Sequence, residues 1–179
     1  MKKLTTITGN PLVANGIAVV IAIAAYIFIY KGIWRISPPL WARGVGFIFL
    51  IVLAVSLLLL HELIHILAAN IFARGAGASL HIRALVWECR LKKPLARNHY
   101  IAYALAPGVF ISGLAFMLFY ILNSSDLKFF ASISFVIGLS SAGGDYWFVA
   151  KILKFPKESL IFDNGMQMEI MLAEDGDSE

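Results

Sequence analysis

The chain has 179 residues, of which 60% are hydrophobic and only 15% are charged. A soluble domain has about 45–50% apolar and about 25% charged residues, so this composition excludes an ordinary soluble protein and indicates a polytopic membrane domain. The net charge of +4 does not indicate a nucleic-acid partner, because the basic residues gather at the ends of apolar segments. The single cysteine, Cys89, excludes an intrachain disulfide and a multi-cysteine zinc cluster.

Four apolar segments are long enough to cross a lipid bilayer, which takes about 20 residues. In chain order they cover residues 11–30, 45–73, 101–122 and 129–150. All are hydrophobic on every side and too long for strands, so they predict helices. The first is too long for a signal-peptide core, and we expect it to be retained. The expected fold is therefore an all-α integral membrane protein, with about four transmembrane helices in residues 1–155 and a short cytoplasmic tail in residues 156–179.

The distribution of basic residues predicts the orientation in the membrane. They concentrate at both termini and in the loop between the second and third segments. The loop between the third and fourth segments has only Lys128, beside Asp126, whereas the first loop is moderately basic. Because cytoplasmic loops carry the excess of lysine and arginine, we expect both termini and the second loop to be cytoplasmic.

The second segment contains His61-Glu62-Leu63-Ile64-His65, and Glu62 is the only charged residue between positions 45 and 73. A charged side chain at the bilayer centre costs roughly 2.5–3.5 kcal/mol, so such residues usually have a function. Histidines four residues apart lie on the same face of a helix and can bind one zinc ion, with Glu62 beside them as a candidate general base. The alternatives are a proton relay, an ion path, or a structural hydrogen bond inside a bundle.

Asp145 is the candidate third zinc ligand. It lies in the fourth segment, which runs in the same direction as the second, and both Asp145 and His65 lie roughly 9–14 Å from the cytoplasmic boundary. Gly143 and Gly144 precede it and allow a close approach of helices or a local unwinding that aims the carboxylate. The alternative is that these glycines only pack and that Asp145 caps a kink.

Residues 76–91 alternate between apolar and polar side chains, with a shift of parity near position 85. This pattern predicts extended, β-like structure with a bulge or bend. The segment could pair as an edge strand with an extended substrate, or lie on the membrane with Trp87 at the interface. Four further residues are candidate metal ligands: His81, Glu88 and Cys89 within this segment, and His99 beyond it. None of them has a recognised zinc-ligand spacing.

Pro107-Gly108 lies within the third segment. Proline there predicts a kink, or an opening for water or substrate where neighbouring protein satisfies the freed carbonyl.

Together these motifs resemble the site-2-protease class of intramembrane zinc peptidases. The resemblance rests on His61-Glu62-Leu63-Ile64-His65, the basic strand-like segment, Ala106-Pro107-Gly108 and Gly143-Gly144-Asp145. The layout is closest to a small bacterial membrane family of zincin peptidases, over about residues 45–154. Two positions depart from the class: Tyr146 follows the aspartate where glycine is usual, and Phe110 stands where the class has asparagine.

The resemblance implies a membrane-embedded zinc metalloendopeptidase that hydrolyses peptide bonds in or near transmembrane segments of a membrane protein or peptide substrate. His61, His65 and Asp145 would hold Zn²⁺, and Glu62 would activate a zinc-bound water. It also implies a bacterial or archaeal cytoplasmic membrane. Two alternatives remain open: a non-catalytic zinc-binding membrane scaffold, and an ion or proton transporter that uses the same polar residues.

Overall fold

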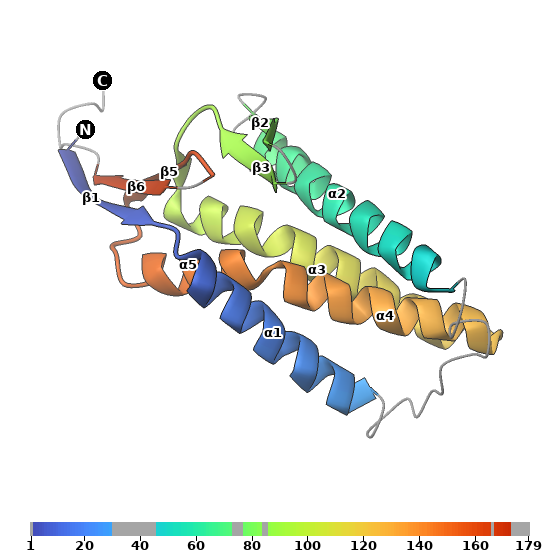
Figure 1. Cartoon of the computed structure of the whole chain (residues 1–179). Helices are drawn as coiled ribbons and strands as arrows, with labels where there is room; N and C mark the ends of the chain where they lie inside the picture. Colours follow the sequence, from blue (N-terminus) through green and yellow to red (C-terminus); the bar gives the residue numbers. More distant parts are fainter. Residues whose placement is uncertain (1, 30–45, 73–76, 84–85, 166, 173–179) are drawn as a thin grey trace.

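The computed structural model describes residues 2–29, 46–72, 77–83, 86–165 and 167–172. Most of the described chain is helical (Figure 1). The helices are α1 (Pro11–Ile27), α2 (Gly46–Phe72), α3 (Arg97–Ile121), α4 (Ser125–Ser141) and α5 (Gly143–Ile152). The strands are β1 (Lys2–Thr8), β2 (Ala78–Arg83), β3 (Val86–Leu91), β4 (Leu95–Ala96), β5 (Ser159–Asp163) and β6 (Gln167–Leu172).

Three helical segments of the described chain are long and apolar enough to cross a membrane. They are Ile48–Phe72, Arg97–Ile121 and Ser125–Ile152, the last of which combines α4 and α5. They correspond to the second, third and fourth predicted segments and indicate a membrane-associated protein. The first predicted segment forms α1, which has 17 residues in the described part and is shorter than a typical span. The described chain therefore shows three candidate spans, and the expected count of four is not confirmed.

The fourth predicted segment is divided into two helices at Ala142, where α4 ends and α5 begins. Gly143 follows the break and lies against α1: a Cβ atom there would be 2.8 Å from the carbonyl oxygen of Ala14 and 2.9 Å from the amide nitrogen of Ala18. Gly143 thus permits close packing with α1, as the sequence predicted for a small residue. The helix also breaks locally at this point, as the sequence predicted for two consecutive glycines. The break sets the start of α5 two residues before Asp145.

A four-stranded antiparallel sheet joins the two ends of the chain, in the order β1-β6-β5-β4. In β5 and β6, buried residues alternate with less buried ones, and Ile161, Met168 and Ile170 are fully enclosed in the core. The expectation of an all-α protein was therefore wrong in this respect, and the predicted tail contains two core strands. The sequence of residues 166–172 is only partly strand-like, and in β5 two of the three buried residues, Ser159 and Asp163, are polar, so the sequence gives a weak signal for a core sheet.

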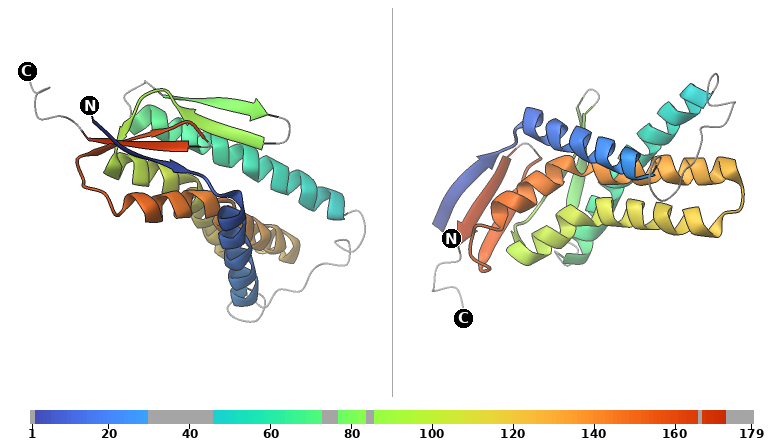
Figure 2. Two further views of the ribbon diagram at one scale, coloured as in Figure 1. Left: turned by 60° about the vertical axis from the view of Figure 1, so that its left-hand side comes forward. Right: turned by 90° about the horizontal axis from the view of Figure 1, so that it is seen from below.

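The predicted extended segment forms a hairpin of β2 and β3 along α2 (Figure 2). The prediction of extended structure is confirmed. The alternation of apolar and polar residues changes between β2 and β3, at the connection of two strands, whereas a bulge or bend in one extended segment was expected. The four-stranded sheet lies at one end of the helices, whereas the hairpin extends from that end along α2 (Figures 1 and 2).

Helix α3 continues through Pro107, which is buried, without a break. At the next residue, a Cβ atom would lie 2.7 Å from the hydroxyl oxygen of Tyr146 in α5. Gly108 thus allows α3 to lie close to Tyr146 in α5, the residue after Asp145. The kink or opening that the sequence predicted at Pro107 stays a prediction.

Candidate metal centre

The three predicted ligands come together between α2 and α5. Their ligand atoms all lie within 4.8 Å of one another, and they form the only such group of histidine, cysteine and acidic residues within the part of the chain that the structure describes. Nε2 of His61 lies 3.2 Å from Oδ2 of Asp145, and Nε2 of His65 lies 3.4 Å from Oδ1. Both imidazoles are buried, with 5% and 4% of their residue surfaces exposed.

Local helix geometry explains this meeting. His61 and His65 are four residues apart on α2 and therefore face the same side of the helix. His65 lies seven residues before the end of α2 at Phe72, and Asp145 lies seven residues before the end of α5 at Ile152, each distance being about 10 Å. The sequence predicted that His65 and Asp145 lie at similar distances from the cytoplasmic boundary, and in the structure their side chains lie side by side.

Hydrogen bonds on the far side of each ring fix how the histidines are presented. Nδ1 of His65 lies 3.2 Å from the carbonyl oxygen of Tyr103, which can only accept, so this nitrogen carries the proton. Nδ1 of His61 lies 3.2 Å from Oγ of Ser141, whose own proton goes to the carbonyl of Gly138 at 3.2 Å. Ser141 can therefore accept from His61. In the neutral form of each ring, Nε2 then carries the lone pair that a metal ion shared with Asp145 would accept.

This donor set fits zinc. Two imidazole nitrogens and one carboxylate are typical zinc ligands, and a catalytic site keeps a fourth position open. In a tetrahedral centre with bonds of about 2.0–2.1 Å, neighbouring ligand atoms lie about 3.3 Å apart. The two nitrogen–oxygen distances, 3.2 Å to Oδ2 and 3.4 Å to Oδ1 of Asp145, are close to that value, and all the ligand atoms lie within 4.8 Å of one another. A metal-binding histidine usually donates its other ring N–H to a carbonyl or similar acceptor, as both histidines do.

Glu62 lies beside the ligand cluster and lines the same cavity, which has a volume of about 200 Å³. The backbone amide of Cys89 in β3 lies beside its carboxylate. The pairing of β2 with β3 explains this contact. The amide of Lys92 bonds to the carbonyl of Gly77, which fixes which residue pairs of the hairpin are hydrogen-bonded to each other. Cys89 belongs to the alternate set of residues in β3, whose backbone N–H and C=O groups point away from β2. The free edge of the hairpin thus faces the cavity.

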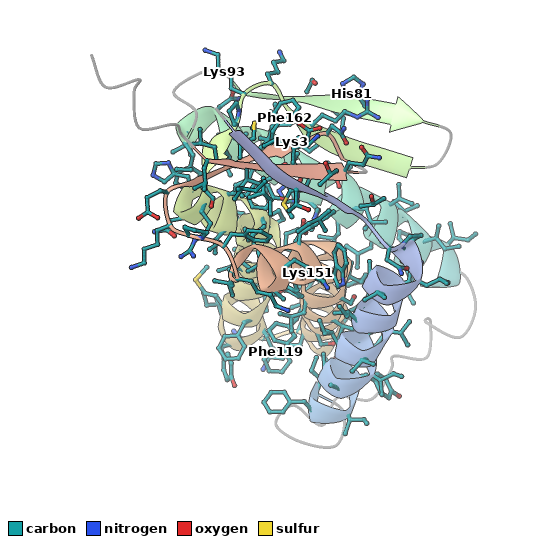
Figure 3. All side chains as sticks on the ribbon, turned by 90° about the vertical axis from the view of Figure 1, so that its left-hand side faces the viewer. Lys3, His81, Lys93, Phe119, Lys151 and Phe162 are labelled. Atoms are coloured by element: carbon teal, nitrogen blue, oxygen red, sulfur yellow. The ribbon has the colours of Figure 1, made fainter. Side chains whose placement is uncertain are left out.

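The alternative ligands lie elsewhere or have other partners. His81 is exposed on the hairpin, where its Nε2 lies 3.0 Å from Oγ of Ser79 (Figure 3). His99 stacks on Phe72 at a ring distance of 5.3 Å. Cys89 lines the cavity, but burial raises the pKa of its thiol to about 12, which disfavours the thiolate that metals bind. The side chain of Glu88 falls outside the described part.

The sequence interpretation missed Asp163, the last residue of β5, which lines the cavity with only 7% of its surface exposed. The hydroxyl of Tyr100 donates to its Oδ2 at 2.5 Å, and the backbone amide of Gly165 donates to its Oδ1 at 2.8 Å. The only sequence signal was Asp163-Asn164-Gly165, which predicts a turn and carries no information about the metal centre.

A histidine pair and an aspartate meeting between long apolar helices define a membrane-associated candidate metal centre. A family model described as "Putative zincin peptidase" matches residues 54–160, which is more than half of the chain and includes all three candidate ligands and Glu62. The chain belongs to this family, and membership indicates a zinc metallopeptidase. Searches of curated proteins and of solved structures found no match.

Proposed function

We propose that the protein is a membrane-embedded, zinc-dependent metalloendopeptidase in which His61, His65 and Asp145 hold the metal and Glu62 is the general base. The observation that carries the proposal is the orientation of the two imidazoles, whose Nδ1 atoms are occupied by Ser141 and Tyr103 while both Nε2 atoms face Asp145. A purely structural ion pair does not need both outer nitrogens fixed in this way, whereas a metal site does.

Zinc at this position would supply a Lewis acid that polarises the scissile carbonyl and makes water a better nucleophile. Glu62 follows the ligand His61 in the chain and lines the same cavity, so its carboxylate can accept the proton of an attacking water and return it to the leaving amine. The amide of Cys89, which lines the same cavity, lies beside that carboxylate. Asp145 compensates part of the metal charge in a region of low dielectric constant.

Three features support a substrate in or near the membrane. The ligands lie about 10 Å inside the ends of α2 and α5, within segments apolar enough to span a bilayer. Large apolar side chains on α2, such as Leu67 and Ile71, are exposed and suited to contact lipid. The free edge of β3 borders the cavity and could pair with an extended substrate segment. The basic second loop and termini favour a site near the cytoplasmic face.

The test is a paired measurement of metal content and proteolysis on the purified full-length chain. The wild type should bind about one zinc ion and cleave a membrane peptide. Glu62→Gln keeps a hydrogen-bonding side chain but cannot accept the proton, so it should retain zinc while cleavage falls by about 10²- to 10⁴-fold.

The outcomes separate the alternatives. Zinc in both proteins without any cleavage would favour a non-catalytic scaffold. Full activity of Glu62→Gln would remove Glu62 from the reaction. A chain that binds no metal but carries ions or protons across vesicles would favour a transporter and contradict the proposal.

A further inference from the structure

Asp163 brings a third carboxylate to the cavity that holds the candidate metal centre. It comes from β5 and not from a membrane helix, and it lies three residues beyond the region that the family model matches. The Tyr100 hydroxyl and the Gly165 amide each donate to one of its oxygens. A carboxylate has about four acceptor positions, so each oxygen can accept one further hydrogen bond.

Acidic side chains outnumber lysine and arginine around the cavity. Three carboxylates line it, those of Glu62, Asp145 and Asp163, and no lysine or arginine is among the described lining residues. A divalent metal ion offsets two of these charges. The donors to Asp163 are neutral, and burial raises its pKa, the usual result of enclosing a carboxylate without a cationic partner. A buried charge of this kind is stabilised by a charge of opposite sign.

We infer that Asp163 is a specificity-determining residue that accepts a positively charged ammonium group of the substrate next to the bond to be cleaved. The inference rests on the proposed function, because it assigns a substrate class to that site. The ammonium group could belong to a lysine side chain, as an endopeptidase substrate allows, or to a free amino terminus, in which case the same site would act as an aminopeptidase. Either would place a charged donor against Asp163, whose two described donors are neutral.

The variant Asp163→Asn tests this role with little structural change. Asparagine has nearly the same shape, and its carbonyl oxygen can still accept from the amide of Gly165, so mainly the charge is lost. A matched control is Glu158→Gln, which removes one negative charge from an exposed position just before β5. Both changes are made in the full-length Glu62→Gln protein, which should bind substrates without consuming them.

Three peptides of equal length serve as probes and differ only in charge. The first has a central lysine and an acetylated amino terminus, the second has norleucine at that position and a free amino terminus, and the third has norleucine and an acetylated terminus. Zinc-loaded protein in detergent should bind one of the two charged peptides about ten- to hundredfold more tightly than the neutral one, the range of a charge-assisted hydrogen bond. The charged peptide that binds more tightly than the neutral one identifies the source of the ammonium group.

Asp163→Asn should abolish this preference and keep its zinc, while Glu158→Gln should leave the preference unchanged. Equal affinity for all three peptides in the parent protein would overturn the inference without any Asp163 variant. It would also be overturned if Asp163→Asn retained the preference, if that variant lost zinc, or if both variants lost the preference equally. Failure of the wild-type chain to cleave any peptide would count against the proposed function alone, because the binding comparison does not depend on cleavage.

Discussion

The hydrogen bonds behind the two histidines determine how the candidate ligands are presented. Each ring has one nitrogen bonded to an oxygen on a neighbouring helix, Tyr103 O in α3 or Ser141 Oγ in α4, and the other directed at Asp145 in α5. Two helices, α3 and α4, therefore orient the histidine ligands that α2 carries, and α5 supplies the third ligand. Outer partners of this kind commonly contribute 10- to 100-fold in metal affinity.

Ser141→Ala should accordingly weaken zinc binding by about 10- to 100-fold, because Nδ1 of His61 loses its acceptor. The measurement is competition with a chelating dye. Ser140→Ala is the matched control, since the Ser140 hydroxyl bonds only to its own helix, at Ile137, among the described contacts. Equal zinc affinity of Ser141→Ala and the wild type would contradict the assigned role of Ser141.

The thiol of Cys89 should be inert although it borders the cavity. Burial raises its pKa to about 12, against an ordinary value of 9.0. Near pH 8 the folded chain therefore has roughly a thousandfold less thiolate than the unfolded chain, and alkylation by iodoacetamide should be slower by a similar factor. The protonated thiol favours folding below the unfolded pKa, and this contribution is lost as pH rises toward 12. Equally fast alkylation of native and denatured protein would disprove this prediction.

At the scale of elements, the position of Asp145 depends on the contact between α5 and α1. Gly143 lies two residues before Asp145 and faces backbone atoms of α1 that cannot move as a flexible side chain would. A methyl group there must push the start of α5 away from α1. Such a shift displaces the carboxylate from the histidines.

Gly143→Ala should therefore destabilise the protein by about 1–3 kcal/mol, the usual cost of overpacking, and should also weaken zinc binding. Thermal unfolding in detergent and metal titration measure the two effects. Gly113→Ala is the control, because a Cβ atom at Gly113 in α3 meets nothing within 4 Å, and alanine there should leave the stability unchanged or raise it by up to about 1 kcal/mol. Equal stability of the two variants would argue against the α1 contact.

The sequence predicts those parts of the site that follow from local geometry. The spacing of His61 and His65 fixes their common face on a helix, and the depth of Asp145 within its apolar segment predicts its partners. Asp163 could not be predicted, because its position depends on where β5 packs against α3, through Tyr100. The pairing of β1 with β6 is equally non-local, since it joins residues more than 150 positions apart whose alternating patterns are short.

At the scale of the whole molecule, the pairing of β1 with β6 places both ends of the described chain on the same side. A salt bridge of 2.6 Å between Lys3 and Glu169 joins these strands at the surface. The candidate centre lies toward the same end, because Cys89, Asp163 and Gly165 from the two sheets line its cavity. The orientation of the termini therefore also determines which membrane face the site adjoins.

Reporter fusions test this orientation. A reporter at the carboxyl terminus should be cytoplasmic, and a reporter inserted at Asp126, at the start of α4, should lie outside, following the distribution of basic residues. Fusions at both ends of the chain should agree with each other. The reverse assignment would place the metal centre near the external face and contradict the proposed cytoplasmic location.

The most direct test of the central claim is the metal content of the purified full-length chain, compared between the wild type and Asp145→Ala. The wild type should contain about one zinc ion per chain, held by three protein ligands, and Asp145→Ala should lose most of it because two histidines leave the ion under-coordinated. Normal folding of both proteins, checked by circular dichroism, ensures that the loss concerns the site. A folded wild-type chain that binds no transition metal, or an Asp145→Ala variant that binds zinc as tightly as the wild type, would contradict the proposed metal centre.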